Sequence, residues 1–373
     1  MKLHPLLIVL LLTTLVGFAS GLLLPQLLPL RPSAPLHLIF ALGIMPLIMG
    51  AMTYFVPVLT RTRTAEPRAL APALLALAAG LLLSFSLFFS FSLYPLAALL
   101  GLVAAGWLSL WILQRKRQTL GRPHPGLLWY QLALLALIGG LLAILAAFFL
   151  PEQWGPLRRL HLHLNLLGFV GLTALGTLRV LLPTTGGYSD PDAGPWLMQQ
   201  WPWMVAGTLL IAAGAAWSPA AALLGVLLWL LPLARLLKSL LVTHRSTVWR
   251  SHGAVTSLAG AVLGLLVILL SGAAHAEGWL PPTNTTHAFI PLFLLPLVSG
   301  AATHLLPLWL STSNKQREQS LRSRLGRYSA VRATLFLLGG LFILAGQGWG
   351  LVPVLLALAQ FLVTVLLSLR PNY

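Results

Sequence analysis

The chain is made largely of apolar stretches about 20 residues long, and this feature limits its fold more than any other. A helix of that length just crosses the hydrocarbon core of a bilayer. We expect an all-α, polytopic membrane bundle of twelve transmembrane helices, because 58% of the residues are apolar and only 8% are charged. The expected spans are 5–24, 35–58, 69–90, 93–114, 127–149, 159–182, 196–216, 219–241, 248–272, 284–309, 330–346 and 349–369.

Two breaks between these spans are short, and the first span has a second interpretation. The segments SFSLY and GQGWG separate the two closely spaced pairs, and each offers a tight connection. Lys2 precedes an apolar run that ends in small residues, which is also the pattern of a signal peptide. The length of the run favours a retained span, and its removal would disturb the count of four helices per repeat described below.

The basic residues predict the orientation of the chain. If the N-terminus is inside, all 23 Lys and Arg lie on the inner side except Arg31, Arg158 and Arg159. Such an asymmetry is typical of cytoplasmic loops. We therefore expect cytoplasmic N- and C-termini and an inner (cytoplasmic) membrane of a bacterium as the location. The basic excess then reflects topology and not a nucleic-acid partner.

A spaced pattern recurs three times along the chain. In each copy a histidine is followed by a glycine after 13 residues and by a proline seven residues later. The histidines are 126 and 124 residues apart, which indicates an internal repeat. We expect one transmembrane domain, 1–373, with four-helix repeats at approximately 1–120, 121–245 and 246–373. The copies are His37–Gly50–Pro57, His163–Gly176–Pro183 and His287–Gly300–Pro307, and we expect the prolines to end helices at the inner face.

The residue types present restrict the chemistry. There is no cysteine, which excludes disulfides, iron–sulfur ligation and thioether-linked haem. Histidine inside an apolar span is costly and marks a candidate functional site. The six acidic residues all lie in or near loops, which disfavours carboxylate-coupled transport and proton pumping.

Two of the repeated segments resemble a known family. HLIFALGIMPLIMGAMTYFVPVL and HAFIPLFLLPLVSGAATHLLPLW are similar to the second and tenth helices of subunit I of the haem-copper oxidases. The resemblance implies that His37 and His287 hold one low-spin haem from opposite faces, and that His163 occupies the position of a copper ligand. The NnrS-like proteins, membrane proteins with haem and copper that are linked to nitric oxide stress, share the second-helix spacing and are nearer in size.

The chain departs from the oxidase pattern at the oxygen-reducing centre. Thr285 stands where the family has the ligand of its catalytic haem, and Leu167 stands where it has a tyrosine. The seventh span offers Gln199 and Gln200 in place of a copper-binding histidine pair. A terminal oxidase or nitric oxide reductase of the ordinary kind is therefore not expected.

The sixth span carries a second group of candidate residues. His161 and His163 are about 200° apart around a helix and cannot easily share one metal. We expect one of them to bind a second cofactor, and a haem more than copper. Arg158 and Arg159 precede them directly and match haem propionates in charge and depth. His252 and His304 are expected to be polar residues with hydrogen-bond partners. His275 lies with Glu277 in an outer loop, where a surface metal site is an open alternative.

The sequence thus predicts a haem-binding membrane protein, with b-type haem as the cofactor and copper as the alternative metal. It would act in electron transfer or in handling nitric oxide or copper, with membrane lipid, an electron donor and a small gas as partners. Two alternatives stay open. One is a divergent enzyme that reduces nitric oxide or oxygen at a second site, and the other is a transporter without haem.

Overall fold

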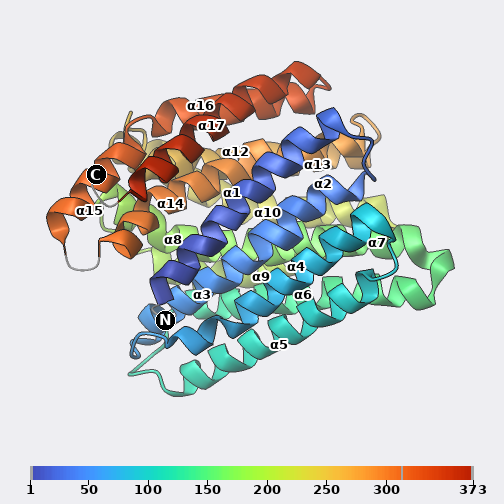
Figure 1. The fold of residues 1–373 in the computed structure, drawn as a ribbon, viewed down its shortest axis with the longest axis horizontal. Coiled ribbons are helices and arrows are strands. Elements are labelled where there is room, and N and C mark those ends of the chain that lie inside the picture. Colours follow the sequence, from blue (N-terminus) through green and yellow to red (C-terminus); the bar gives the residue numbers. More distant parts are fainter. Residues whose placement is uncertain (1–2, 312–313, 371–373) are drawn as a thin grey trace. The chain divides into compact units, whose positions relative to one another are not determined.

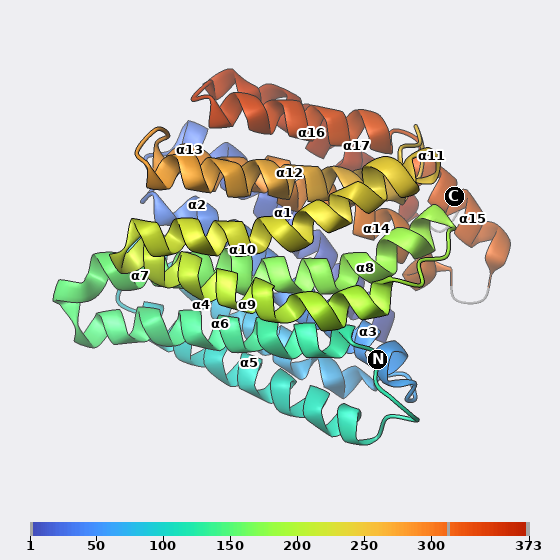
Figure 2. The same ribbon diagram turned by 180° about the vertical axis from the view of Figure 1, so that it is seen from behind.

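The structure is a computed structural model that describes residues 3–311 and 314–370. Within these residues the chain is 86% helical and has no strand, so the expected all-α class is confirmed. Lys2, which contributes to the expected topology, lies outside them. The arrangement of the helices can be followed in Figures 1 and 2.

Eleven helical stretches of the described chain are long and apolar enough to cross a membrane. Each overlaps one of the expected spans, although some begin well before it, and together they confirm an integral membrane protein. The stretches are His4–Leu27, Ser33–Thr60, Pro67–Phe89, Tyr94–Arg117, Gly126–Phe149, Pro151–Gly186, Pro219–Thr243, Ala254–Ala276, Pro282–Leu310, Lys315–Leu344 and Gly348–Ser368.

The remaining expected span, 196–216, is helix α9, Ala193–Trp217. This helix has 25 residues but is not among the eleven apolar stretches. Its N-terminal half contains Gln199 and Gln200 together with tryptophans, which lower its hydropathy. The described residues thus contain eleven apolar stretches, and the expected count of twelve is not confirmed.

The chain forms two compact units. Unit 1 consists of residues 1–176 and 194–218, and within it α4, α5 and α6 lie side by side in both views (Figures 1 and 2). Its elements are α1 (Leu3–Leu27), α2 (Ser33–His37), η1 (Leu38–Ile44), α3 (Met45–Thr60), η2 (Pro67–Leu70), α4 (Ala71–Phe89), α5 (Tyr94–Arg117), α6 (Gly126–Phe149), η3 (Pro151–Gln153), α7 (Trp154–His163), η4 (Leu164–Gly171), the start of α8 (Leu172–Gly186) and most of α9.

Unit 2 consists of residues 177–193 and 219–373. Helix α12 packs on α10, α14 and α16, and α16 pairs with α17. Its elements are the end of α8, α10 (Pro219–Lys238), η5 (Ser239–Thr243), α11 (Arg245–Val248), α12 (Ala254–Ala276), α13 (Pro282–Phe289), η6 (Ile290–Leu294), α14 (Leu295–Leu310), α15 (Lys315–Gly326), α16 (Ser329–Leu344), η7 (Gly348–Gly350) and α17 (Leu351–Ser368).

A short π-helical segment follows each histidine of the repeated pattern. η1 begins directly after His37, η4 directly after His163, and η6 three residues after His287. π-Helical turns are rare and occur often at functional sites. The three spans that carry the pattern therefore share a backbone feature as well as a residue spacing.

Small residues allow neighbouring helices to approach these π-helical segments closely. In unit 1 a Cβ added to Gly80 of α4 would lie 2.4 Å from the carbonyl oxygen of Ala41 in η1. In unit 2 a Cβ added to Gly264 of α12 would lie only 1.7 Å from the carbonyl oxygen of Leu292 in η6. No side chain fits at either position, so glycine determines how closely these helices pack.

The expectation that the three prolines end their helices is wrong. Pro57, Pro183 and Pro307 lie inside α3, α8 and α14, and each helix continues for three residues beyond its proline. A proline in the last turn removes only one backbone hydrogen bond. The proline carbonyls still accept bonds from the residues that follow, as Pro307 does from the Ser311 N–H at 3.0 Å.

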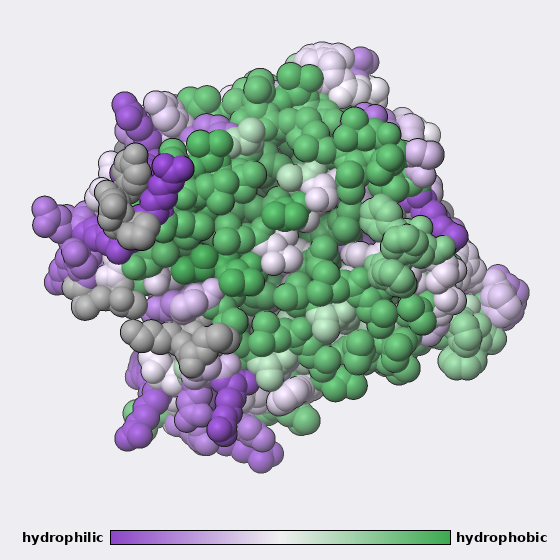
Figure 3. Space-filling view, in the orientation of Figure 1, coloured by the Kyte–Doolittle hydropathy of each residue, from purple (hydrophilic) through white to green (hydrophobic). Residues whose placement is uncertain are grey.

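The outward-facing surface suits a bilayer. Figure 3 shows apolar side chains over the flanks of the helices and hydrophilic side chains toward the helix ends. Leucine, valine and phenylalanine side chains are exposed on most of the spans. The two tight connections expected from the sequence are present, with Phe91 and Gly346 in left-handed backbone conformations.

Candidate functional site

Unit 1 brings two of the sequence-predicted histidines together. His37 is the last residue of α2 and His161 lies in the last turn of α7. Their ring centroids are 6.3 Å apart, and the ring planes differ by 19°. The sequence predicted a ligand role for His37 and for one of His161 and His163, but it did not predict that His37 and His161 are neighbours.

Both imidazoles are oriented by the backbone. The Nδ1 atom of His37 is 2.7 Å from the carbonyl oxygen of Ser33, and the Nδ1 atom of His161 is 2.8 Å from that of Gly140. A carbonyl oxygen only accepts, so Nδ1 carries the proton in each ring. The Nε2 atom of each neutral ring then has a lone pair, which is the arrangement found in metal-ligating histidines.

Gly140 and Asn165 shape the surroundings of His161, and the sequence analysis did not identify either of them. Asn165 Nδ2 donates to the carbonyl oxygen of His161 at 2.7 Å. A Cβ added to Gly140 would lie 2.6 Å from that Nδ2 atom, so a side chain at this position would press on the Asn165 amide. The polar residue four positions after His161 was the available signal for Asn165, since i and i+4 share a helix face.

His163 points elsewhere on the same helix. Its Nδ1 atom donates to the carbonyl oxygen of Arg159 at 2.8 Å. Arg159 itself donates from Nε to the carbonyl oxygen of Ala215 at 2.7 Å and from Nη2 to that of Ala216 at 3.1 Å. It therefore binds the C-terminal carbonyls of α9, where a cation is favourable. Arg158 is exposed, and the propionate role of the two arginines stays a prediction.

His287 belongs to unit 2. It lies in α13 near the start of its span, and its side chain is exposed. Thr285, at the position of the missing haem ligand, is half-buried in the same helix. Because His37 and His287 are in different units, the haem expected between them also stays a prediction.

Three further histidines of unit 2 have hydrogen-bond partners. The Nδ1 atom of His304 is 3.1 Å from Nη1 of Arg322, and that of His252 is 2.6 Å from the carbonyl oxygen of Arg327. His275 is 3.3 Å from the carbonyl oxygen of Leu280 through its Nδ1 atom. Each of these three rings is thus hydrogen-bonded within the protein, as the sequence predicted for His252 and His304.

Within the described parts of the chain, no group of three or more His, Asp or Glu side chains is arranged to hold a metal ion. The sequence matches no protein-family model and no curated protein. Fold and surface define the class as an integral membrane protein of bundled helices, and the paired histidines of unit 1 are its candidate site.

Proposed function

We propose that this protein is a haem-binding integral membrane protein in which His37 and His161 would hold one b-type haem through its iron. The observation that carries the proposal is the pair itself. Two imidazoles from different helices lie 6.3 Å apart, and both hold their Nδ1 proton against a backbone carbonyl.

The separation of the rings fits one metal between them where their Nε2 atoms face each other. Two metal–nitrogen bonds of about 2.0 Å, plus the distance from each Nε2 atom to its ring centre, separate two opposed imidazole centres by roughly 6 Å. The observed 6.3 Å agrees with this value. An aromatic packing contact also occurs at such distances, and the spectrum described below distinguishes the two.

The number of ligands favours haem over a bare metal ion. The porphyrin already supplies four nitrogens, so a haem iron needs only two from the protein. A structural Zn²⁺ ion needs four protein ligands, and the pair provides two. Copper is the alternative metal, and metal analysis of the purified protein separates the two cases.

Two axial histidines suit electron transfer. A bound haem supplies a one-electron couple, whose potential the axial ligands and their hydrogen bonds set. An iron ligated by histidine on both faces has no open position for a gas. We therefore propose electron transfer for this site, and assign any handling of nitric oxide to a second site near His163 or His287.

The membrane arrangement belongs to the proposal as well. Helix α9 would be a twelfth span, because its 25 residues extend about 37 Å and the hydrocarbon core is about 30 Å thick. Three repeats are supported by the π-helical segment next to each repeated histidine. The distribution of Lys and Arg supports cytoplasmic termini in a bacterial inner membrane.

Absorption spectra of the purified protein test the proposal. We expect the dithionite-reduced wild type to have the sharp α band of a low-spin haem. His37→Ala and His161→Ala should each remove this band. The control His252→Ala changes an exposed histidine of unit 2 and should retain the band.

The variant His287→Ala separates the two candidate pairings. If the iron lies between His37 and His161, the α band survives this change. If His287→Ala removes the band and His161→Ala does not, the pairing expected from the family resemblance is correct. A wild type without haem absorption would reject the proposed function altogether.

A further inference from the structure

Helix α15 is a short basic helix between two membrane spans. The preceding span ends with α14 at Leu310, and the next helical stretch, Lys315–Leu344, begins with α15 and has its apolar part in α16, Ser329–Leu344. With α14 and α16 in the bilayer, the 12 mostly polar residues of α15 lie at the membrane surface. Leu321 and Leu325, four residues apart, are 1% and 0% exposed, so one face of the helix packs on the bundle.

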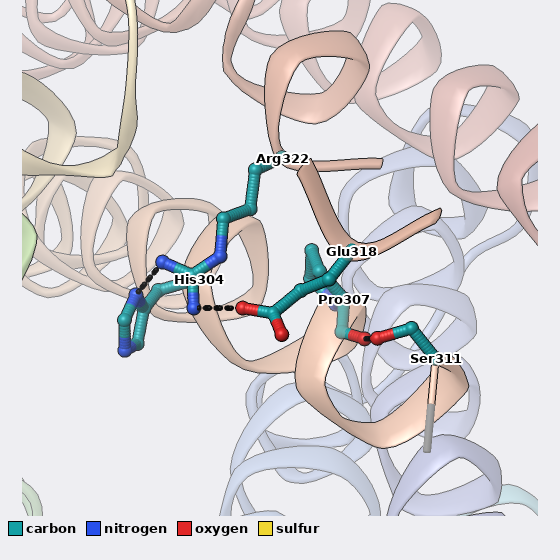
Figure 4. A network of polar contacts seen from close by, with 5 residues as sticks. All are labelled: His304, Pro307, Ser311, Glu318 and Arg322. Atoms are coloured by element: carbon teal, nitrogen blue, oxygen red, sulfur yellow. Dashed lines mark hydrogen bonds and ion pairs between the residues drawn. The ribbon is translucent and has the colours of Figure 1, made fainter. Parts of the chain in front are cut away.

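Two arginines fix this helix in place. Arg322 of α15 donates from Nη1 to the Nδ1 atom of His304 in α14 at 3.1 Å, and its Nη2 lies 2.7 Å from Glu318 Oε1 (Figure 4). Arg332 of α16 is 1% exposed and donates to the carbonyl oxygen of Leu325 at 3.4 Å. The helix is thus held on α14 and α16 in one orientation.

The remaining side chains give α15 an excess of positive charge. Glu318 is the single acid between 314 and 330, and Arg322 already pairs with it. Lys315 and Arg327 are exposed, and Tyr328, which is 49% exposed, lies under the Arg327 guanidinium at 5.5 Å. Tyrosine is common at the level of lipid headgroups.

We propose that α15 and the residue after it form a binding surface for the phosphate groups of anionic phospholipids. Its cations are Lys315, Arg317, Arg324 and Arg327. A helix that lies directly between two spans is level with the headgroups, and basic residues at this depth attract anionic lipid. The charge of the surface is complementary to that of the headgroups.

The test measures which lipids the full-length protein retains. The protein is reconstituted in bilayers of equal amounts of phosphatidylglycerol and phosphatidylcholine, extracted in mild detergent, and the lipids bound per chain are quantified by mass spectrometry. The α15 variant replaces four cations with glutamine and leaves the two fixing arginines intact. The changes are Lys315→Gln, Arg317→Gln, Arg324→Gln and Arg327→Gln.

A matched control removes four exposed cations of unit 1. These are Arg63→Gln, Arg68→Gln, Lys116→Gln and Arg117→Gln. We expect the wild type to retain phosphatidylglycerol preferentially. The control should lose less of this preference than the α15 variant, because its four cations are divided between the segment 63–68 and the end of α5 and do not share one helix. Each basic residue near a membrane surface accounts for roughly a fivefold preference for anionic lipid. The α15 variant should therefore retain at least about tenfold less phosphatidylglycerol per chain than the wild type.

Three outcomes would overturn the proposal. The first is an α15 variant that retains as much phosphatidylglycerol as the wild type. The second is displacement of the lipid by inorganic phosphate, which would identify a site for the free anion. The third needs no variant: retention by the wild type that does not fall with rising salt would exclude an electrostatic surface.

Discussion

Gly140 offers a way to disturb the proposed haem site without touching a ligand. In the variant Gly140→Ala the new Cβ would lie 2.6 Å from Asn165 Nδ2 and 3.4 Å from the carbonyl oxygen of His161. Non-bonded heavy atoms settle at about 3.5 Å or more. Helix α6 or the Asn165 side chain therefore moves by roughly 1 Å, and the expected loss of affinity is that for a movement of α6.

The expected size of the effect follows from the hydrogen bond at this position. His161 Nδ1 donates to the Gly140 carbonyl at 2.8 Å, and a shift of roughly 1 Å lengthens this bond beyond the useful limit of about 3.2 Å. Loss of such a bond behind a metal ligand lowers metal affinity by about 10–100-fold. This corresponds to about 1.4–2.7 kcal/mol of binding free energy.

The assay is a haem titration of apoprotein, followed by absorbance, with Gly139→Ala as the control. At Gly139 an added Cβ would meet only Leu164 Cδ1 at 3.5 Å, which is an ordinary contact. Both changes replace a helical glycine by alanine, so they share the same effect on helix propensity. The control should bind haem as tightly as the wild type.

A double variant distinguishes the specific loss of the His161 hydrogen bond from a general destabilisation by overpacking. Overpacking alone destabilises a protein by about 1–3 kcal/mol. In Gly140→Ala combined with Asn165→Ala the obstructing amide is gone, so the His161 hydrogen bond can form again and haem affinity should recover at least in part. Equal haem affinities for Gly140→Ala and Gly139→Ala would refute the reasoning.

Three further predictions concern stability and activity. Gly264→Ala should lower the thermal unfolding midpoint strongly, because its Cβ would lie 1.7 Å from the Leu292 carbonyl oxygen, whereas Gly272→Ala in the same helix has open space and should not; equal midpoints would contradict the packing described. Burial lowers the pKa of His124, whose Nδ1 accepts the Gly126 N–H, so the unfolded chain binds the proton more readily and stability should fall as the pH drops through about 6.5. This slope in the unfolding free energy should flatten in His124→Gln. Oxygen uptake with an artificial electron donor should stay near background, and sustained cyanide-sensitive turnover would instead support the enzyme alternative.

Apolar length was sufficient to locate the spans, but not every element. The expected spans 127–149 and 349–369 correspond to Gly126–Phe149 and Gly348–Ser368 within a residue or two. Helix α15 lies between two expected spans and cannot be located by apolar length, because its many charged residues surround a single apolar face, Leu321 and Leu325. Asn314 before it, whose side chain accepts the Arg317 N–H at 3.0 Å, was the available start signal.

The candidate site was only partly accessible from the sequence. Spacing and the cost of burying histidine identified His37, His161, His163 and His287 as candidates. Which of these histidines contact each other depends on how the helices pack, and the spacing of residues within one helix does not determine that packing. The close approach of α2 and α7 that joins His37 to His161 involves contacts far apart in the chain. The π-helical segments were missed for a similar reason, since a change in hydrogen-bond register leaves composition unchanged.

The π-helical segments also bear on how such a chain can change over evolutionary time. Each of these turns accommodates about one residue more than an α-helical turn, so the segment absorbs a single-residue insertion without breaking the span. Deleting one residue within Leu38–Ile44 would let the span continue as a regular α-helix, but would rotate His37 by about 100° relative to α3. The insertion or deletion of one codon can therefore change the direction in which the histidine side chain points, while the membrane-crossing helix itself persists.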